Sequence, residues 1–161
     1  MPVNLVVRQA VDDDAQLIAD LTRACWAGTV AVTSSGHRET AQRVAEQLRD
    51  GGAFLLLQGE AAVGSVRWTP HEFEPDVWEI RRMGVLPHCR GANLSQHLLE
   101  AVIHQGLASG VHELRLAVRS DQPRLIDLYA AYQFDLADEL DYSHANEAEP
   151  APRVMRRVLR H

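Results

Sequence analysis

At 161 residues, with 46% hydrophobic and 24% charged residues, the chain has the length and composition of one globular domain spanning 1–161. Its formal net charge of −6 argues against a general nucleic-acid-binding protein, and no apolar run has the length of a membrane-spanning segment. Two cysteines provide no disulfide framework and the N-terminus has no signal-peptide pattern, so we expect a cytoplasmic protein.

The first half of the chain predicts a strand, two helices and a hairpin. Residues 3–10 are rich in β-forming types, and Asp13 is expected to cap the helix that follows them. A second helix is expected from about residue 37 to residue 49, where apolar side chains recur at helical spacing. Two apolar runs around a tight turn, at 53–58 and 62–68, predict a β-hairpin.

The middle of the chain predicts a strand, a tight turn and a helix in close succession. Residues 77–85 form the strand, and Pro87 ends it because proline cannot donate to a sheet. Residues 90–93 are small or tolerate left-handed geometry, and the apolar stripe of a helix follows over 94–107. The free N–H groups and the positive dipole end at such a helix start predict a phosphate site, with Arg90 at its rim.

The remaining elements complete a mixed sheet. A strand is expected at 113–118, a helix within 120–134, a short strand within 134–140 and a closing strand at 153–159. Because hairpins alternate with strand–helix–strand units, the fold class is α/β, in the sense of an α+β mixed sheet. Gly84, inside the central strand, predicts a bulge or the close approach of a ligand.

The central turn resembles motif A of the GNAT superfamily, the acyl-CoA-dependent N-acyltransferases, which usually runs Pro-x-x-Arg-Gly-x-Gly-x-Gly/Ala. Pro87, Arg90 and Gly91 match this pattern. Asn93 stands at a glycine position and Ser95 at a glycine or alanine position. Both departures are mild, because asparagine is the non-glycine residue that best tolerates left-handed geometry and serine is small.

A second motif supports the resemblance. The family often carries Asn-x-x-Ala-x-x-Leu-Tyr-x-x-x-Gly-Phe after the next strand, and Leu128, Tyr129 and Phe134 match it. The positions that differ from this motif are Gln122 for Asn, Leu125 for Ala and Gln133 for Gly. The two motifs together imply a GNAT-like fold, in which a central mixed sheet of about six to seven strands is flanked by about four helices.

The resemblance implies transfer of an acetyl group from acetyl-CoA, the acyl-donor cosubstrate, to a primary amine of a small molecule or peptide in a ternary complex. The charge and the lack of a long apolar run predict no nucleic-acid or membrane partner, and the spacing of the histidines predicts no metal site. Homodimers are common in the family. One alternative is a degenerate module that binds CoA without turnover. Another is an acyltransferase that uses a longer acyl group or an oxygen acceptor. The acidic segment 138–149 would attract a cationic acceptor, or is an ordinary solvated loop.

The expected cofactor contacts follow from the turn and from the resemblance. By resemblance, the strand end at Met83 and Val85 separates from the strand at 113–118, and their N–H groups bond the pantetheine arm and the thioester carbonyl. Gln122 stands at the motif asparagine and is expected at the cofactor. The pyrophosphate is expected on the backbone N–H groups of Arg90, Gly91, Ala92, Asn93, Leu94 and Ser95.

Two side chains are candidates for proton transfer. Tyr129 is expected to act as the general acid for the departing thiolate, since a phenol is protonated at neutral pH. The alternative for Tyr129 is a core aromatic, with Tyr132 as the substitute acid. Glu79 is expected to deprotonate the amine through a water, and the alternative is a strand-surface carboxylate paired with Arg81 or Arg67.

Overall fold

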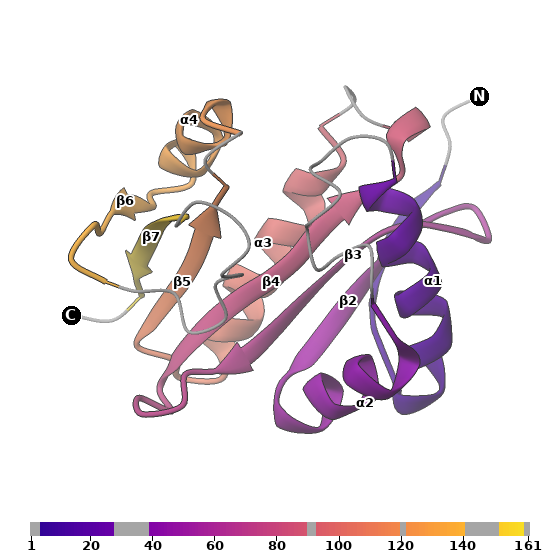
Figure 1. Ribbon diagram of the computed structural model, residues 1–161, viewed down its shortest axis with the longest axis horizontal. Coiled ribbons are helices and arrows are strands. Elements are labelled where there is room, and N and C mark those ends of the chain that lie inside the picture. Colours follow the sequence, from indigo (N-terminus) through magenta and orange to yellow (C-terminus); the bar gives the residue numbers. More distant parts are fainter. Residues whose placement is uncertain (1–3, 28–38, 90–92, 120–121, 141–151, 160–161) are drawn as a thin grey trace.

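The computed structural model describes residues 4–27, 39–89, 93–119, 122–140 and 152–159. These residues form one sheet with helices on both of its faces (Figure 1). The strands are β1 Leu5–Gln9, β2 Gly52–Gln58, β3 Ala61–Pro70, β4 Val77–Val85, β5 Glu113–Val118, β6 Asp135–Leu136 and β7 Arg153–Val158. The helices are α1 Ala15–Trp26, α2 Ala41–Asp50, α3 Ser95–Ala108 and α4 Arg124–Ala131, with 3-10 turns η1 Asp12–Asp14 and η3 Pro87–Cys89.

The seven strands are ordered β1-β2-β3-β4-β5-β7-β6. All neighbouring strands are antiparallel except β4 and β5, which are parallel because α3 connects them as a crossover. Figure 1 shows α1 and α2 in front of the sheet and α3 behind it. This architecture confirms the mixed sheet of six to seven strands flanked by four helices.

Each face of the sheet packs against its own hydrophobic core, because β2 has apolar side chains on both faces. Leu55 packs against α1 and α2 on one face, where Ile18 is also fully buried. The next residue, Leu56, packs on the opposite face with Trp68 of β3 and Leu98 of α3. Each such fully buried side chain stabilises the fold by roughly 1.5–3 kcal/mol. The two cores hold the sheet rigidly between the helix layers.

Several predicted boundaries differ locally from the structure. Asp14, not Asp13, is the residue that precedes the first helix, and its carboxylate accepts the Val11 N–H at 2.8 Å and two bonds from Arg8. The second helix begins at residue 41 rather than near 37, and Thr40 caps it. The strand expected within 134–140 is reduced to the two residues of β6.

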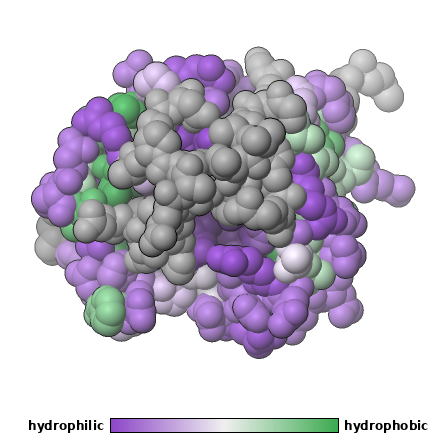
Figure 2. All heavy atoms as spheres, in the orientation of Figure 1, coloured by the Kyte–Doolittle hydropathy of each residue, from purple (hydrophilic) through white to green (hydrophobic). Residues whose placement is uncertain are grey.

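The described surface is mostly polar on the face that Figure 2 presents, where the hydrophobic side chains form small separate groups. Large hydrophobic side chains that are exposed lie far apart along the chain, among them Val11, Phe73 and Leu136. Scattered apolar side chains of this kind are normal on a globular protein.

Candidate active site

The sheet opens between β4 and β5. Their pairing is confined to three positions, which join Val77–Glu79 to Glu113–Arg115. Beyond these positions the two strands diverge, as Figure 1 shows, although both continue for several residues. Backbone groups that lose their ladder partners in this way need other hydrogen-bond partners, and a ligand can supply them. The family resemblance predicts this separation.

A β-bulge lies in β4 beside the opening. The register with β3 shifts there, so that Val66 faces both Arg82 and Met83. Arg82 has φ of 53°, in the left-handed region that side chains with a Cβ rarely adopt. The bulge is therefore two residues earlier than Gly84, where the sequence predicted it.

Gly84 allows a close approach, but by a protein side chain rather than a ligand. A Cβ on Gly84 would lie 2.9 Å from Cζ3 of Trp26 and 3.5 Å from Cβ of Cys25, both on α1. The glycine thus lets the indole ring of α1 pack directly on β4. This contact fixes α1 against the strand that borders the opening.

Substitution of Gly84 by alanine is expected to displace the Trp26 ring and to lower the free energy of unfolding by roughly 1–3 kcal/mol, as overpacking does. Urea denaturation of the wild type and the variant measures this loss. In a Trp26→Leu background the same substitution should be less destabilising, because the clashing atom is gone. An equal loss of unfolding free energy in both backgrounds would contradict the contact between Gly84 and the Trp26 ring.

The backbone N–H group of Val85 points toward the opening. The Leu86 N–H donates to the Val63 carbonyl of β3 at 2.8 Å. Because successive N–H groups of a strand point to alternate sides, the N–H of Gly84 also faces β3. The N–H group of Val85 then faces the side that β5 has left.

The predicted pyrophosphate turn leads directly into α3. The first helical bonds run from the Gln96 N–H to the Asn93 carbonyl and from the His97 N–H to the Leu94 carbonyl. The N–H groups from Asn93 to Ser95 precede these bonds, so they have no partner within the helix. A helix start of this kind can bind an anion.

Two residues that replace motif glycines keep a glycine-like backbone. Asn93 has φ of 58° and Gln133 has φ of 69°, both in the left-handed region. The substitutions therefore preserve the local chain path, as expected for Asn93. Gln122 lies in the turn before α4, where its carbonyl accepts the Leu125 N–H at 3.1 Å. The predicted ligands Arg90, Gly91 and Ala92 lie outside the described residues.

Tyr129 is buried in the core and keeps its proton. Its ring packs edge-on to Phe134, with centroids 6.2 Å apart, and burial raises its pKa to about 12. The phenol is therefore a protonated donor at neutral pH, as an acid requires. The Tyr132 hydroxyl lies 3.1 Å from both Gln96 Oε1 and Glu100 Oε1 of α3, so it has a structural role between α3 and α4.

Glu79 lies where the two central strands part. It pairs in register with Thr69 of β3 and with Arg115 of β5, at the last position before the opening. Only 1% of Glu79 is exposed, so it is not the surface carboxylate of the alternative interpretation. The Arg67 guanidinium, one suggested partner, binds Glu39 at 2.7 Å.

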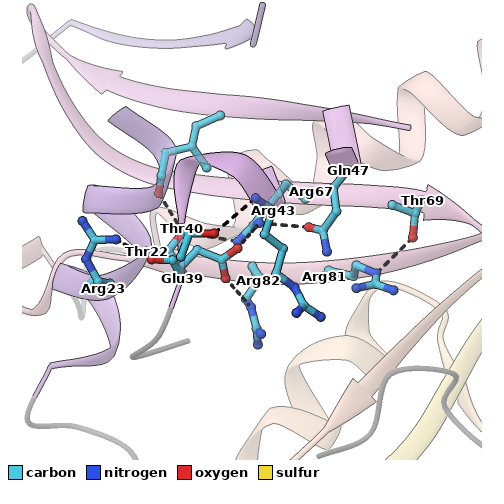
Figure 3. A network of polar contacts seen from close by, with 11 residues as sticks. Thr22, Arg23, Glu39, Thr40, Arg43, Gln47, Arg67, Thr69, Arg81 and Arg82 are labelled. Atoms are coloured by element: carbon cyan, nitrogen blue, oxygen red, sulfur yellow. Dashed lines mark hydrogen bonds and ion pairs between the residues drawn. The ribbon is translucent and has the colours of Figure 1, made fainter. Parts of the chain in front are cut away.

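A buried polar network adjoins the bulge, and the sequence alone did not reveal it (Figure 3). Glu39, just before α2, accepts from Nη1 of Arg67 at 2.7 Å and from Nε of Arg82 at 3.1 Å. Arg67 also donates to Gln47 Oε1 at 2.9 Å and lies near Thr22 Oγ1 at 3.4 Å. Arg67 is fully buried, and the Glu39 side chain is 1% exposed. The network joins α1, α2, β3 and β4.

Opposing effects determine the charge of Glu39. Burial alone would raise the pKa of its carboxyl, but hydrogen bonds and attraction from Arg67 and Arg82 outweigh burial and hold the pKa below its ordinary value. Glu39 is therefore ionised at neutral pH. In the sequence, the adjacent pair Arg81-Arg82 interrupts the alternation of polar and apolar residues in the strand at 77–85. This interruption is the signal that could have pointed to the network.

The residues that the structure describes contain neither a cluster of candidate metal ligands nor a long apolar helix. No group of three or more His, Cys, Asp or Glu side chains among these residues could hold a metal ion. None of their helices is long and apolar enough to cross a membrane.

Comparison with known proteins assigns the family of the chain. Residues 16–134 match the model described as "Acetyltransferase (GNAT) family". The chain therefore belongs to the GNAT acetyltransferase family. It is 26% identical over 136 residues to the mycothiol acetyltransferase of Streptomyces griseus, a match that covers 84% of this chain and 44% of that protein. The chain thus spans about half the length of that relative.

Solved structures share the fold along nearly the whole chain. PaiA N-acetyltransferase from Thermoplasma acidophilum, in complex with coenzyme A, superposes with a TM-score of 0.76 at 14% identity, covering 96% of this chain and 99% of that one. yncA from Salmonella typhimurium, with acetyl-CoA, gives 0.77 at 17% identity, covering 98% and 95%. The ribosomal-protein-S18-alanine N-acetyltransferase from Escherichia coli gives 0.75 at 16% identity, covering 98% and 96%.

Proposed function

We propose that the protein transfers an acetyl group from acetyl-CoA to a primary amine of a small molecule or peptide, by direct attack in a ternary complex. The opening between β4 and β5 carries this proposal, because the pairing of the two strands ends at Glu79 and Arg115 and a ligand can lie between them beyond that point. The acyl-CoA-dependent chemistry agrees with the family. The structures of two neighbours contain coenzyme A or acetyl-CoA.

The donor lies along the opening in this proposal. Backbone N–H groups from residues 90–95 hold the pyrophosphate at the start of α3, and Gln122 lies at the cofactor. The N–H groups of Met83 and Val85 bond the pantetheine arm and the thioester carbonyl. A carbonyl that accepts such a bond becomes a better electrophile, because the same N–H stabilises the oxyanion that forms on attack.

The reaction then proceeds by one addition and one elimination. The neutral amine attacks the thioester carbon, which forms the C–N bond and places negative charge on the oxygen. Collapse of this intermediate breaks the C–S bond and releases the CoA thiolate. Glu79 removes the proton of the attacking nitrogen through a water, and Tyr129 donates a hydrogen bond to the thiolate.

The high pKa of Tyr129 specifies how it acts. A thiol has a pKa of roughly 8.5, whereas that of Tyr129 is about 12, so full proton transfer to the thiolate is unfavourable. Hydrogen-bond donation to the developing charge needs no such transfer. Tyr129 therefore stabilises the leaving group mainly as a donor, and solvent supplies the final proton.

The test is amine-dependent release of CoA thiol from acetyl-CoA, measured with a panel of primary amines and short peptides. Turnover that depends on one amine class, with an N-acetylated product found by mass spectrometry, is expected. CoA binding without turnover on any amine would favour the degenerate CoA-binding module instead.

Replacing Glu79 by glutamine is expected to lower kcat by about 10²–10⁴-fold, the usual contribution of a general base. The rise of kcat with pH that a carboxylate base produces should also disappear. Steady-state rates across pH measure both effects, with Glu46→Gln on the exposed face of α2 as the matched control. An unchanged pH–rate profile in Glu79→Gln would remove Glu79 from the mechanism.

A further inference from the structure

The buried ion pair between Glu39 and Arg82 lies at the one position of β4 where the backbone is left-handed. We propose that Glu39 is a positioning residue, which clamps the bulge at Arg82 and thereby aims the N–H groups of Met83 and Val85 at the acyl donor. The proposal rests on the donor site proposed above. It assigns a role to a residue that lies outside the opening itself.

Glu39 is well placed to act as a fixed anchor. Its backbone carbonyl accepts from Nη1 of Arg23 on α1, and its carboxylate accepts from Arg67 on β3 at 2.7 Å. The side chain is 1% exposed, so water does not compete for these bonds. The second carboxylate oxygen accepts from Nε of Arg82 at 3.1 Å. The anchor thus ties the bulge to α1 and β3 (Figure 3).

The bulge needs such support. A residue with a Cβ at φ of 53° is in a sparsely populated conformation, which persists only where the surroundings hold it. The Arg82 side chain is 23% exposed, so it lies at the edge of the buried network with its Nε toward Glu39. The ion pair therefore opposes relaxation of the Arg82 backbone.

Relaxation of the bulge would change which groups face the donor. The extra residue in β4 sets the register of Met83–Val85 against β3. Because the facing of strand residues alternates with period two, a shift by one residue turns the N–H group of Val85 toward β3. The opening would then present the N–H of Gly84 instead, and the donor would lose its bonds.

The decisive comparison is between Arg82→Ala and Arg82→Gly. Alanine removes the clamp and keeps a Cβ, which makes φ of 53° unfavourable, whereas glycine removes the clamp and adopts this φ readily. We expect the dissociation constant of CoA to rise about tenfold in Arg82→Ala, as after loss of one hydrogen bond, and to stay near the wild-type value in Arg82→Gly. Glu39→Gln, which keeps the side-chain shape, should behave like Arg82→Ala.

Calorimetric titration with CoA, well below the unfolding temperature, gives these constants. Asp14→Asn is the matched control, since it breaks the Arg8 ion pair on another part of the fold and should leave CoA binding unchanged. Wild-type affinity in Arg82→Ala and Glu39→Gln would overturn the clamp and leave the proposed function intact. Equal weakening in Arg82→Ala and Arg82→Gly would also overturn it, because Arg82 would then bind the donor itself.

Two further outcomes are decided by the same experiment. If Glu39→Gln does not fold, the comparison of the two Arg82 variants decides alone. If the wild-type protein binds no CoA, the proposed function fails and the clamp fails with it.

Discussion

Replacing Tyr129 by phenylalanine is expected to lower kcat by about 10²–10³-fold while the KM for acetyl-CoA changes little, because the hydroxyl donates to charge that develops only during the reaction. The ring stays in place, since phenylalanine keeps the edge-on packing against Phe134. Steady-state thiol release at saturating amine measures the loss. Wild-type kcat in the variant would assign Tyr129 to the core alone.

The pH dependence and a second tyrosine sharpen this test. Burial raises the pKa of Tyr129 to about 12, so the hydroxyl stays protonated through the neutral range and the fold-loss in kcat should be constant there. Tyr132→Phe is the matched control, since that hydroxyl bonds Gln96 and Glu100 of α3. A larger loss of kcat in Tyr132→Phe than in Tyr129→Phe would make Tyr132, rather than Tyr129, the donor to the leaving thiolate.

Replacing Glu39 by alanine is expected to lower the free energy of unfolding by about 3–5 kcal/mol, the usual loss when one partner of a buried ion pair is removed. Arg67 is fully buried, and after the change it keeps only the neutral partners Gln47 and Thr22 among its described contacts. Urea denaturation at neutral pH measures the difference. If the free energy of unfolding fell only as little as it does on loss of a surface ion pair, Glu39 would not be the buried partner of Arg67 that the structure shows.

The same variant should show a defined pH dependence. Burial raises the pKa of Glu39, but Arg67 and Arg82 lower it further, to a native value below the ordinary 4.5. The stabilisation from ionised Glu39 is therefore complete above pH 4.5 and is lost as the pH falls through the lower native pKa. The difference in the free energy of unfolding between wild type and Glu39→Ala should therefore become smaller as the pH falls over that range. Asp138→Ala, in an exposed ion pair with Arg153, is the control and should leave the denaturation midpoint near the wild type.

Local sequence patterns predicted the elements that border the candidate site. The strand at 77–85 and the strand at 113–118 have the bounds expected from apolar runs that end at proline, glycine or polar residues. The left-handed backbone of Asn93 was likewise expected, since the property depends on that residue and its immediate neighbours. Such features are encoded within a few positions of the chain.

Features that depend on distant pairing were not predictable in the same way. The bulge at Arg82 is a property of the register between β3 and β4, and a single strand does not contain it. Glu39 lies 28 positions before Arg67 and 43 before Arg82, so no local pattern joins them. Gly84 suggested a ligand because its true neighbour, the Trp26 ring, reaches it only in the folded protein.

The measurement that tests the central claim most directly is calorimetric titration of the purified protein with acetyl-CoA, followed by competition with CoA. Saturable binding with a micromolar dissociation constant, about −8 kcal/mol, is predicted, together with displacement by CoA. Absence of binding up to millimolar acetyl-CoA would contradict a donor site between β4 and β5, and with it the proposed acetyl transfer.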